Sequence, residues 1–442
     1  MAMAGGMILD MRLQPQDTQK SVWMSPLSHV SSFFHSFSDV FRQTPFSLLF
    51  CSLTGLLAGI GLSLMTDMLQ LLPGLMILIP PAIAMRGNIY SALVSRLGTS
   101  MHLGLFSPTL KKGSVLHLNA YASLLLTLFL SVVLGFLAKL VAETYGVLGT
   151  NYITLSGFIL ISVIGGLISG FILLGISILV SITGYRRNWD LDNMSSPIIT
   201  SAGDMITIPS LFFAAVLLLK LNSYNAKIMG FLSSVTLLAV LVVFVAIICT
   251  VKGLKSNNAE LRRILFESIP MLLVCGILCT FAGITLDMEL ENLITAILVL
   301  IPPFLGACNA LGGILSARLS SMLHIGTLIP KQFPDKLVAA NFTVIYLLSV
   351  AVFSFVGLIT YFATAPTGTV FPGALEQLAK MLAIALLGGV LCTTFLNFAS
   401  YYIAILSFKF GLDPDNDTIP LITSLTDVVG VLCLLFAMQI IL

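Results

Sequence analysis

Two aspartates of this chain lie in apolar surroundings where an ionised carboxylate is rare. Asp204 ends the stretch DNMSSPIITSAGD (192–204), and Asp427 ends the stretch DNDTIPLITSLTD (415–427). Seven of the thirteen positions are identical between these stretches, at an offset of 223 residues. A buried carboxylate is costly unless it is paired, solvated or bound to a cation. Two such aspartates in a duplicated motif therefore indicate a shared function.

Hydroxyl groups accompany each aspartate at helical spacing. Thr200 and Ser201 precede Asp204 by four and three residues, so the three side chains share one face of a helix. The second copy repeats the pattern with Thr423, Ser424 and Asp427. If the copies face one another, two carboxylates converge among hydroxyl and carbonyl oxygens, a ligand set that suits a hard divalent ion, above all Mg²⁺. The alternative is that each aspartate is protonated or hydrogen-bonded to a neighbouring hydroxyl and only holds helices together.

A second duplicated motif precedes the first in each half. Residues 79–104 (IPPAIAMRGNIYSALVSRLGTSMHLG) align at an offset of 222 with residues 301–326 (IPPFLGACNALGGILSARLSSMLHIG). The paired prolines free backbone carbonyls from helical hydrogen bonds, while Gly87, Asn88 and Asn309 allow close backbone approach or supply amide oxygens. Spans interrupted by Gly and Pro at equivalent places in two halves predict a transport site, although a kinked packing helix is the alternative. The two amides are one residue out of register.

Composition identifies the environment of these motifs. The 442 residues are 57% hydrophobic and only 9% charged, with a mean hydropathy of +1.05, whereas soluble domains carry about 25% charged residues. These values predict a polytopic protein of the lipid bilayer, and the absence of β-barrel alternation predicts an all-α fold. No basic cluster suggests a nucleic-acid partner. Because there is no P-loop, GxSxG or HExxH motif, we expect neither an enzyme nor an organic cofactor.

Hydropathy predicts about eleven spans, since a membrane-crossing helix needs ~20 apolar residues. They lie near 46–66, 74–98, 116–142, 152–182, 196–219, 228–251, 270–287, 292–317, 338–363, 375–408 and 418–441. With the N-terminus inside, sixteen of the twenty-one basic residues fall in cytoplasmic segments. The positive-inside rule therefore predicts a multi-pass protein of the cell membrane with a cytoplasmic N-terminus and an external C-terminus.

The two offsets predict an internal duplication. We expect a cytoplasmic segment at 1–44, a first five-helix repeat at 45–220, a linker at 221–269 with its own span at 228–251, and a second five-helix repeat at 270–442. The extra crossing of the linker gives both repeats the same orientation. The predicted symmetry is therefore a pseudo-two-fold axis along the membrane normal.

The chain resembles solute carrier family 41, the fused relative of the bacterial MgtE magnesium transporters. The resemblance lies in a Pro-Pro/Gly-Asn span followed by a TxxxD span, present twice with a linker helix between the copies. PPAIAMRGN and SAGDMIT match closely, and the second copies CNALGG and SLTDVVG more loosely. The resemblance implies a pathway between the halves with Mg²⁺ as the transported ion. It implies ligands at Asp204 and Asp427 and pore-lining residues at Gly87, Asn88 and Asn309. Nothing corresponds to the N-domain and CBS domains of MgtE proteins, so their gating does not carry over.

The leading interpretation is transport of divalent cations, preferentially magnesium, by a channel or by a carrier coupled to Na⁺ or H⁺. The two repeats would imitate within one chain the homodimer of MgtE, so we expect a monomer with an internal pseudo-dimer or a homo-oligomer. One alternative is a proton- or sodium-coupled transporter of an organic substrate that uses the same aspartate pair. Another is a structural membrane protein.

Overall fold

The computed structural model describes residues 38–102, 104–144, 153–187, 191–225, 234–289, 295–324, 326–364, 374–410 and 414–442. Within these ranges the chain forms twelve helices and no strand, which confirms the all-α prediction. Residues Ser47–Leu442 make one compact unit. Most of the predicted cytoplasmic segment at 1–44 lies outside the described ranges, which begin at residue 38.

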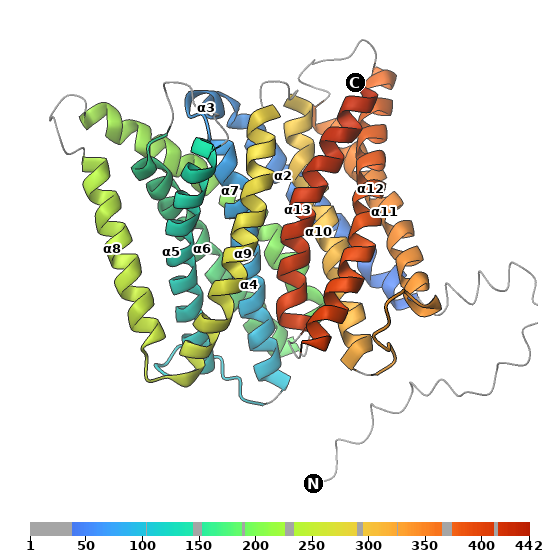
Figure 1. The fold of residues 1–442 in the computed structure, drawn as a ribbon, viewed down its shortest axis with the longest axis horizontal. Helices are drawn as coiled ribbons and strands as arrows, with labels where there is room; N and C mark the ends of the chain where they lie inside the picture. The colour runs from blue at the N-terminus through green and yellow to red at the C-terminus, as the bar shows by residue number, and fades with distance from the viewer. Residues whose placement is uncertain are drawn as a thin grey trace, which may run out of the picture. The chain divides into compact units, whose positions relative to one another are not determined.

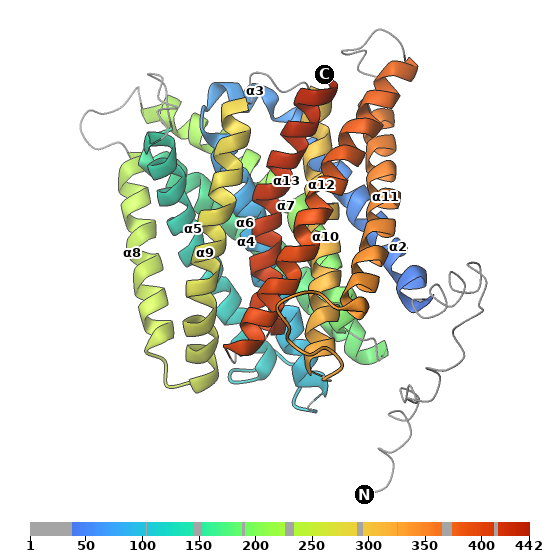
Figure 2. The same ribbon diagram turned by 45° about the vertical axis from the view of Figure 1, so that its right-hand side comes forward.

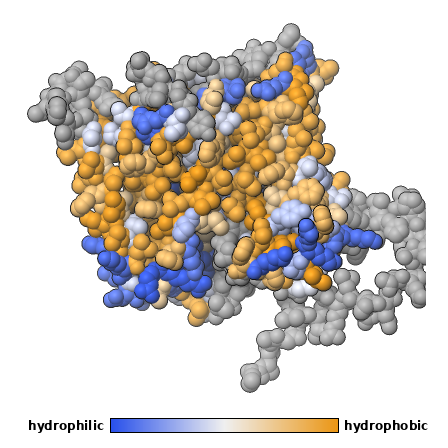
Figure 3. Space-filling model, in the orientation of Figure 1, coloured by the Kyte–Doolittle hydropathy of each residue, from blue (hydrophilic) through white to orange (hydrophobic). Residues whose placement is uncertain are grey.

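Eleven of the helices in the described ranges are long and apolar enough to span a membrane, as predicted (Figure 1). They are α2 (Ser38–Leu64), α4 (Leu75–His102), α5 (Val115–Thr144), α6 (Leu155–Arg187), α7 (Leu191–Asn225), α8 (Ser234–Leu254), α9 (Ala259–Glu289), α10 (Thr295–His324), α11 (Lys336–Thr364), α12 (Ala374–Lys409) and α13 (Pro414–Ile441). The short helix α3 (Thr66–Leu71) lies between α2 and α4. Figure 3 shows a broad hydrophobic band with hydrophilic residues beyond both of its edges, as a bilayer requires.

Two helices begin earlier than their apolar runs. Helix α7 begins at Leu191, not near 196, and α9 begins at Ala259, not at 270. The Asn258 side chain caps α9 by accepting hydrogen bonds from the backbone N–H groups of Glu260 (3.0 Å) and Leu261 (3.2 Å). The charged segment 259–269 consists largely of good helix formers, although hydropathy alone does not mark it as part of a span. The predicted linker boundary at 269 therefore falls inside one continuous helix.

The directions of the helices are compatible with a parallel repeat. Helices α4 and α10 both run from the upper to the lower end of Figure 1, and α7 and α13 both run upward. The described connections at 104–114, 255–258 and 326–335, which carry predicted cytoplasmic lysines, all lie at the lower end. The repeat boundaries themselves stay a prediction.

Four helices form the centre of the unit and carry the duplicated motifs. Helix α4 packs against α7, and α10 packs against α13. Helices α5 and α6 flank the first pair, and α11 and α12 flank the second pair (Figures 1 and 2). The linker helix α8 packs on α5 and α6 at the edge of the unit, away from the duplicated motifs.

The first helix of each predicted repeat packs on the second helix of the other repeat. Gly59 of α2 lies against Val299 of α10, and Gly283 of α9 lies against Ile77 of α4. A Cβ atom at either glycine would collide with the facing carbonyl oxygen. We call this arrangement the helix exchange.

The helix exchange also explains where two proline-freed carbonyls point. Ile77 and Val299 are four residues before Pro81 and Pro303, whose missing N–H groups leave these carbonyls without a helical donor. Both carbonyls face a glycine of the crossing helix, where Cα–H···O contacts are the available partners. They are therefore used in helix packing and do not line the pathway that the Pro-Pro motif predicts.

Candidate ion site

A cavity lies between the predicted halves, with walls from α2, α4, α7, α9, α10 and α13. Eight of the nine sequence-predicted site residues line it: Gly87, Asn88, Thr200, Ser201, Asp204, Asn309, Thr423 and Asp427. The ninth, Ser424, is buried outside the lining, and its backbone carbonyl accepts a long contact from the Cys279 thiol at 4.0 Å. The two motifs of each half thus meet in one place.

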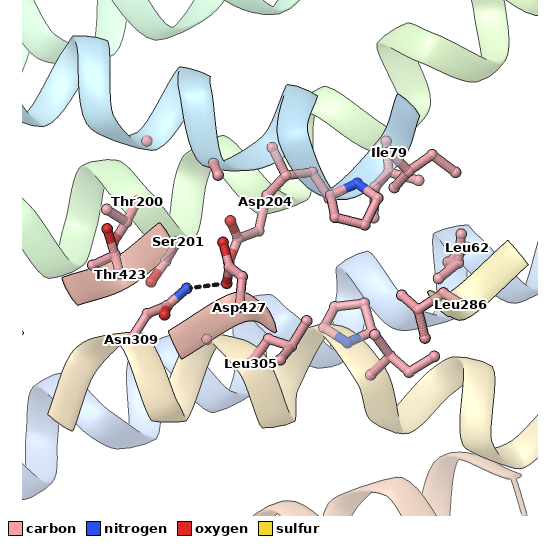
Figure 4. Close-up of a pocket in the computed structure, with 18 of the residues that line it drawn as sticks. Leu62, Ile79, Thr200, Ser201, Asp204, Leu286, Leu305, Asn309, Thr423 and Asp427 are labelled. Carbon is pink, nitrogen blue, oxygen red and sulfur yellow. Dashed lines mark hydrogen bonds between the residues drawn. The ribbon is translucent and has the colours of Figure 1, made fainter. Parts of the chain in front are cut away.

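The two aspartates approach each other across this cavity, as Figure 4 shows. Asp427 is buried, with 6% of its surface exposed. The Asn309 Nδ2 group donates a hydrogen bond to its Oδ1 atom at 2.7 Å, and the Cys279 thiol donates to its Oδ2 atom at 3.5 Å. Both oxygens of this carboxylate are therefore held by neighbouring helices.

Asp204 has different surroundings although it is the equivalent residue. Its side chain is half-buried, and its Oδ2 atom lies 3.5 Å from the point where a Cβ atom on Gly306 would be. Within the described part of the chain, no hydrogen bond reaches its carboxylate; its electrostatic neighbours are Asp427 and the Cys51 thiol. The pair thus consists of one carboxylate fixed by hydrogen bonds, Asp427, and one without them among the described residues, Asp204.

The two amides both contact α13. The Thr423 hydroxyl lies at donor distance from two acceptors, the Pro420 carbonyl at 3.0 Å and Asn88 Oδ1 at 3.3 Å. Asn88 Nδ2 and Asn309 Oδ1 are buried and have no partner among the described residues. Because Thr423 has a single proton, turning the Asn88 amide over lets Nδ2 donate to Thr423. In that arrangement each amide donates to α13 and keeps its oxygen for a ligand.

The cavity has a polar end and an apolar end. Figure 4 places Thr200, Thr423 and Asn309 on one side of the aspartates and Leu62, Ile79 and Leu286 on the other. Leu62 and Leu286 are near the last residues of α2 and α9, so the apolar end faces the predicted external side. The cavity volume is about 70 Å³, and one water needs ~10–15 Å³. The cavity therefore has room for a few waters or a small partly hydrated ion.

The donor set is that of a hard, hydrated cation. Among the described residues, no three His, Cys, Asp or Glu side chains gather to hold a metal ion. Two carboxylates, two amide oxygens and hydroxyl groups remain around the cavity. Mg²⁺ keeps several waters and is often bound through one or two carboxylates, so this sparse set fits it.

Sequence reasoning missed Gly306, Cys279 and the lining leucines Leu62 and Leu286. A signal for them exists, because FCSLTGLLAGI (50–60) aligns with VCGILCTFAGI (274–284) at an offset of 224. This alignment pairs Leu62 with Leu286 and Cys279 with Gly55. These residues lie before the Pro-Pro motifs at 79–104 and 301–326, or, for Gly306, at a position without a polar side chain.

Comparisons with known proteins are compatible with the predicted duplication. The family model for MgtE, described as a divalent cation transporter, matches residues 79–214 and again 301–437. The two matches begin 222 residues apart and end 223 residues apart, the offsets of the two motifs.

Relatives match over most of the chain. Mouse solute carrier family 41 member 3 is 26% identical over 400 residues, which cover 85% of this chain and 78% of the relative. Human solute carrier family 41 member 2 is 23% identical over 80% of this chain, and the match spans only 62% of that protein's length. An inward-facing MATE family multidrug transporter aligns over 89% of this chain and 94% of its own with a TM-score of 0.34 and 14% identity, too weak a likeness to support any argument.

The family model covers more than half of the chain, and each of its two matches contains one Pro-Pro motif and one intramembrane aspartate. The chain is therefore a multi-pass membrane protein that belongs to the MgtE family of divalent cation transporters.

Proposed function

We propose that this protein carries Mg²⁺ across the cell membrane through the cavity between its two halves, with Asp204 and Asp427 as the central ion ligands. One observation carries the proposal: the equivalent carboxylates of the two halves face the same small cavity (Figure 4). Two carboxylates this close repel each other unless a proton or a cation lies between them. A divalent cation neutralises both.

The size of the cavity favours an ion over an organic molecule. Sites for small organic molecules typically enclose about 300–1,000 Å³, and this cavity has about 70 Å³. Both halves of the chain supply oxygen acceptors to its polar part, which suits Mg²⁺ or another hard divalent ion more than a coupled organic substrate. The description of the matching family model, a divalent cation transporter, supports the same substrate class.

The test is Mg²⁺ influx into proteoliposomes that contain the full-length chain, followed with a trapped Mg²⁺-sensitive dye. We expect Asp204→Asn and Asp427→Asn each to raise the KM for Mg²⁺ at least about tenfold, since losing even an outer-shell partner costs about 10- to 100-fold in metal affinity. Asp67→Asn is the matched control, because Asp67 is an exposed carboxylate in the first turn of α3, away from the cavity. Unchanged flux in both cavity variants, or no Mg²⁺ flux in the wild type, would contradict the proposal.

A further inference from the structure

The two halves are equivalent in sequence motif, but the contacts of their aspartates are not. Asn309 and Cys279 hold the two oxygens of Asp427 from α10 and α9. At the equivalent positions the first half has Gly87 and Gly55, which have no side chain to donate a hydrogen bond. The asymmetry therefore follows from residue identity and not from a chance rotamer.

The other amide increases the asymmetry. Asn88, one residue out of register with Asn309, belongs to α4 but contacts Thr423 of α13. Helix α13 thus makes hydrogen bonds with residues of both halves, whereas no hydrogen bond from the described residues reaches the Asp204 carboxylate on α7. Next to Asp204 lies Gly306, which leaves open space beside its Oδ2 atom.

We propose that Asn309 is a positioning residue that fixes Asp427 as the stationary ligand of the ion site, while Asp204 is the ligand that moves with the ion. This inference rests on the proposed function and deepens it. A carboxylate with both oxygens hydrogen-bonded is oriented before the ion arrives, and such partners raise metal affinity by limiting reorganisation. A carboxylate without such partners can rotate toward the ion and away again as the ion leaves.

The side-chain oxygen of Asn309 could itself contact the ion or its bound water. Its Nδ2 group is used by Asp427, and its Oδ1 atom is a buried acceptor without a partner in the described ranges. Buried acceptors are normally satisfied, and a cation or its bound water in the cavity would satisfy this one. A single side chain would then orient one ligand and contribute an oxygen itself.

The experiment compares Asn309→Gly, which copies the first half, with the double variant Asn309→Gly/Ala310→Asn, which restores an amide in the register of Gly87-Asn88. Both variants are assayed for Mg²⁺ flux in proteoliposomes and for Mg²⁺ binding by titration calorimetry of the full-length protein. We expect Asn309→Gly to raise the Kd and the KM for Mg²⁺ about 10- to 100-fold, with a smaller change in the maximal rate. The double variant should not restore affinity, because an amide at position 310 is displaced from Asp427 by one residue.

Asn397→Ala is the matched control, because Asn397 is a fully buried asparagine of α12 outside the cavity lining. It should leave the Kd for Mg²⁺ unchanged. An unchanged Kd in Asn309→Gly would overturn the inference, and so would recovery of the wild-type Kd in the double variant, since only the presence of an amide would then matter. Both outcomes presuppose Mg²⁺ flux in the wild type. A wild type without flux instead overturns the proposed function, so the two failures are distinguishable.

Discussion

At the scale of single residues, the site depends on small side chains that leave room beside the carboxylates. Gly306 is the member of α10 that faces Asp204, and the equivalent residue of the first half is Ala84. Both positions line the cavity, so one methyl group is the difference between the two halves at this point. The space left by the missing methyl group at Gly306 lies beside Asp204, the carboxylate without hydrogen bonds from the described residues.

We expect Gly306→Ala to raise the KM for Mg²⁺ several-fold while the protein still folds. The new methyl group would lie 3.5 Å from Asp204 Oδ2 and would replace water or ion with apolar volume. Flux assays in proteoliposomes measure the effect. Ala84→Gly is the control and should change the KM little, because it only removes a methyl group. Equal effects of the two substitutions would show that the space beside Asp204 has no special role.

Most of the polar residues that line the candidate site could be predicted from the sequence, because intramembrane carboxylates and amides in a duplicated motif are rare and conspicuous. The sequence could not show which carboxylate is held. Asp427 is fixed because Asn309 and Cys279 donate hydrogen bonds to it from two other helices. The periodicity of residues within one helix carries no information about which helices lie next to it. Ser424 shows the same limit, since its helical spacing from Asp427 matches that of Ser201 from Asp204 and only Ser201 lines the cavity.

At the scale of helices, the helix exchange brings backbones into contact without side chains between them. Gly59 and Gly283 occupy equivalent places, and each faces a carbonyl that a proline has freed. Small residues at crossing points are the usual means of close helix packing in membranes. The eleven spans could be predicted from apolar length, but the partner of each helix could not, because lipid-facing and helix-facing apolar residues look alike in a sequence.

Gly283→Ala should destabilise the protein by about 1–3 kcal/mol, the usual cost of forcing extra volume into a packed interior. The added methyl group would collide with the Ile77 carbonyl oxygen and push α9 away from α4. The midpoint of thermal unfolding of the purified protein measures this. Gly175→Ala is the control, since a Cβ atom at Gly175 of α6 meets no atom within 4 Å. A Gly283→Ala midpoint as high as that of the control would contradict close packing at this crossing.

At the scale of the whole molecule, the predicted orientation gives the cavity a direction. Figure 4 shows Leu62 and Leu286 at the end of the cavity opposite Thr200 and Asn309. In the predicted orientation, the end with the leucines faces the exterior and the polar end faces the cytoplasm. Apolar constrictions oppose ion passage by excluding water. In the proposed pathway and the predicted orientation, Leu62 and Leu286 would therefore oppose ion passage on the external side of the aspartates.

The orientation itself is tested by labelling intact cells with a membrane-impermeant thiol reagent. We expect Asp67→Cys in α3 to be labelled from outside and Lys112→Cys, in the connection before α5, to be labelled only after permeabilisation, because the basic connections follow the positive-inside rule. Both residues are exposed. The unmodified protein is the background control, since five of its seven cysteines are buried. The reverse labelling pattern would place the apolar end of the cavity on the cytoplasmic side.

The helix exchange also has a consequence for biosynthesis. Helix α4 emerges from the ribosome long before α9, whose Gly283 packs against the Ile77 carbonyl of α4. Until α9 and α10 are translated, α4 at Ile77 and α2 at Gly59 lack the helices that pack on them in the folded protein. Neither half can reach its final packing as a separate folding unit. Because the two predicted repeats are part of one polypeptide, each helix and its later-translated partner stay together at an effective concentration that two separate chains would not reach.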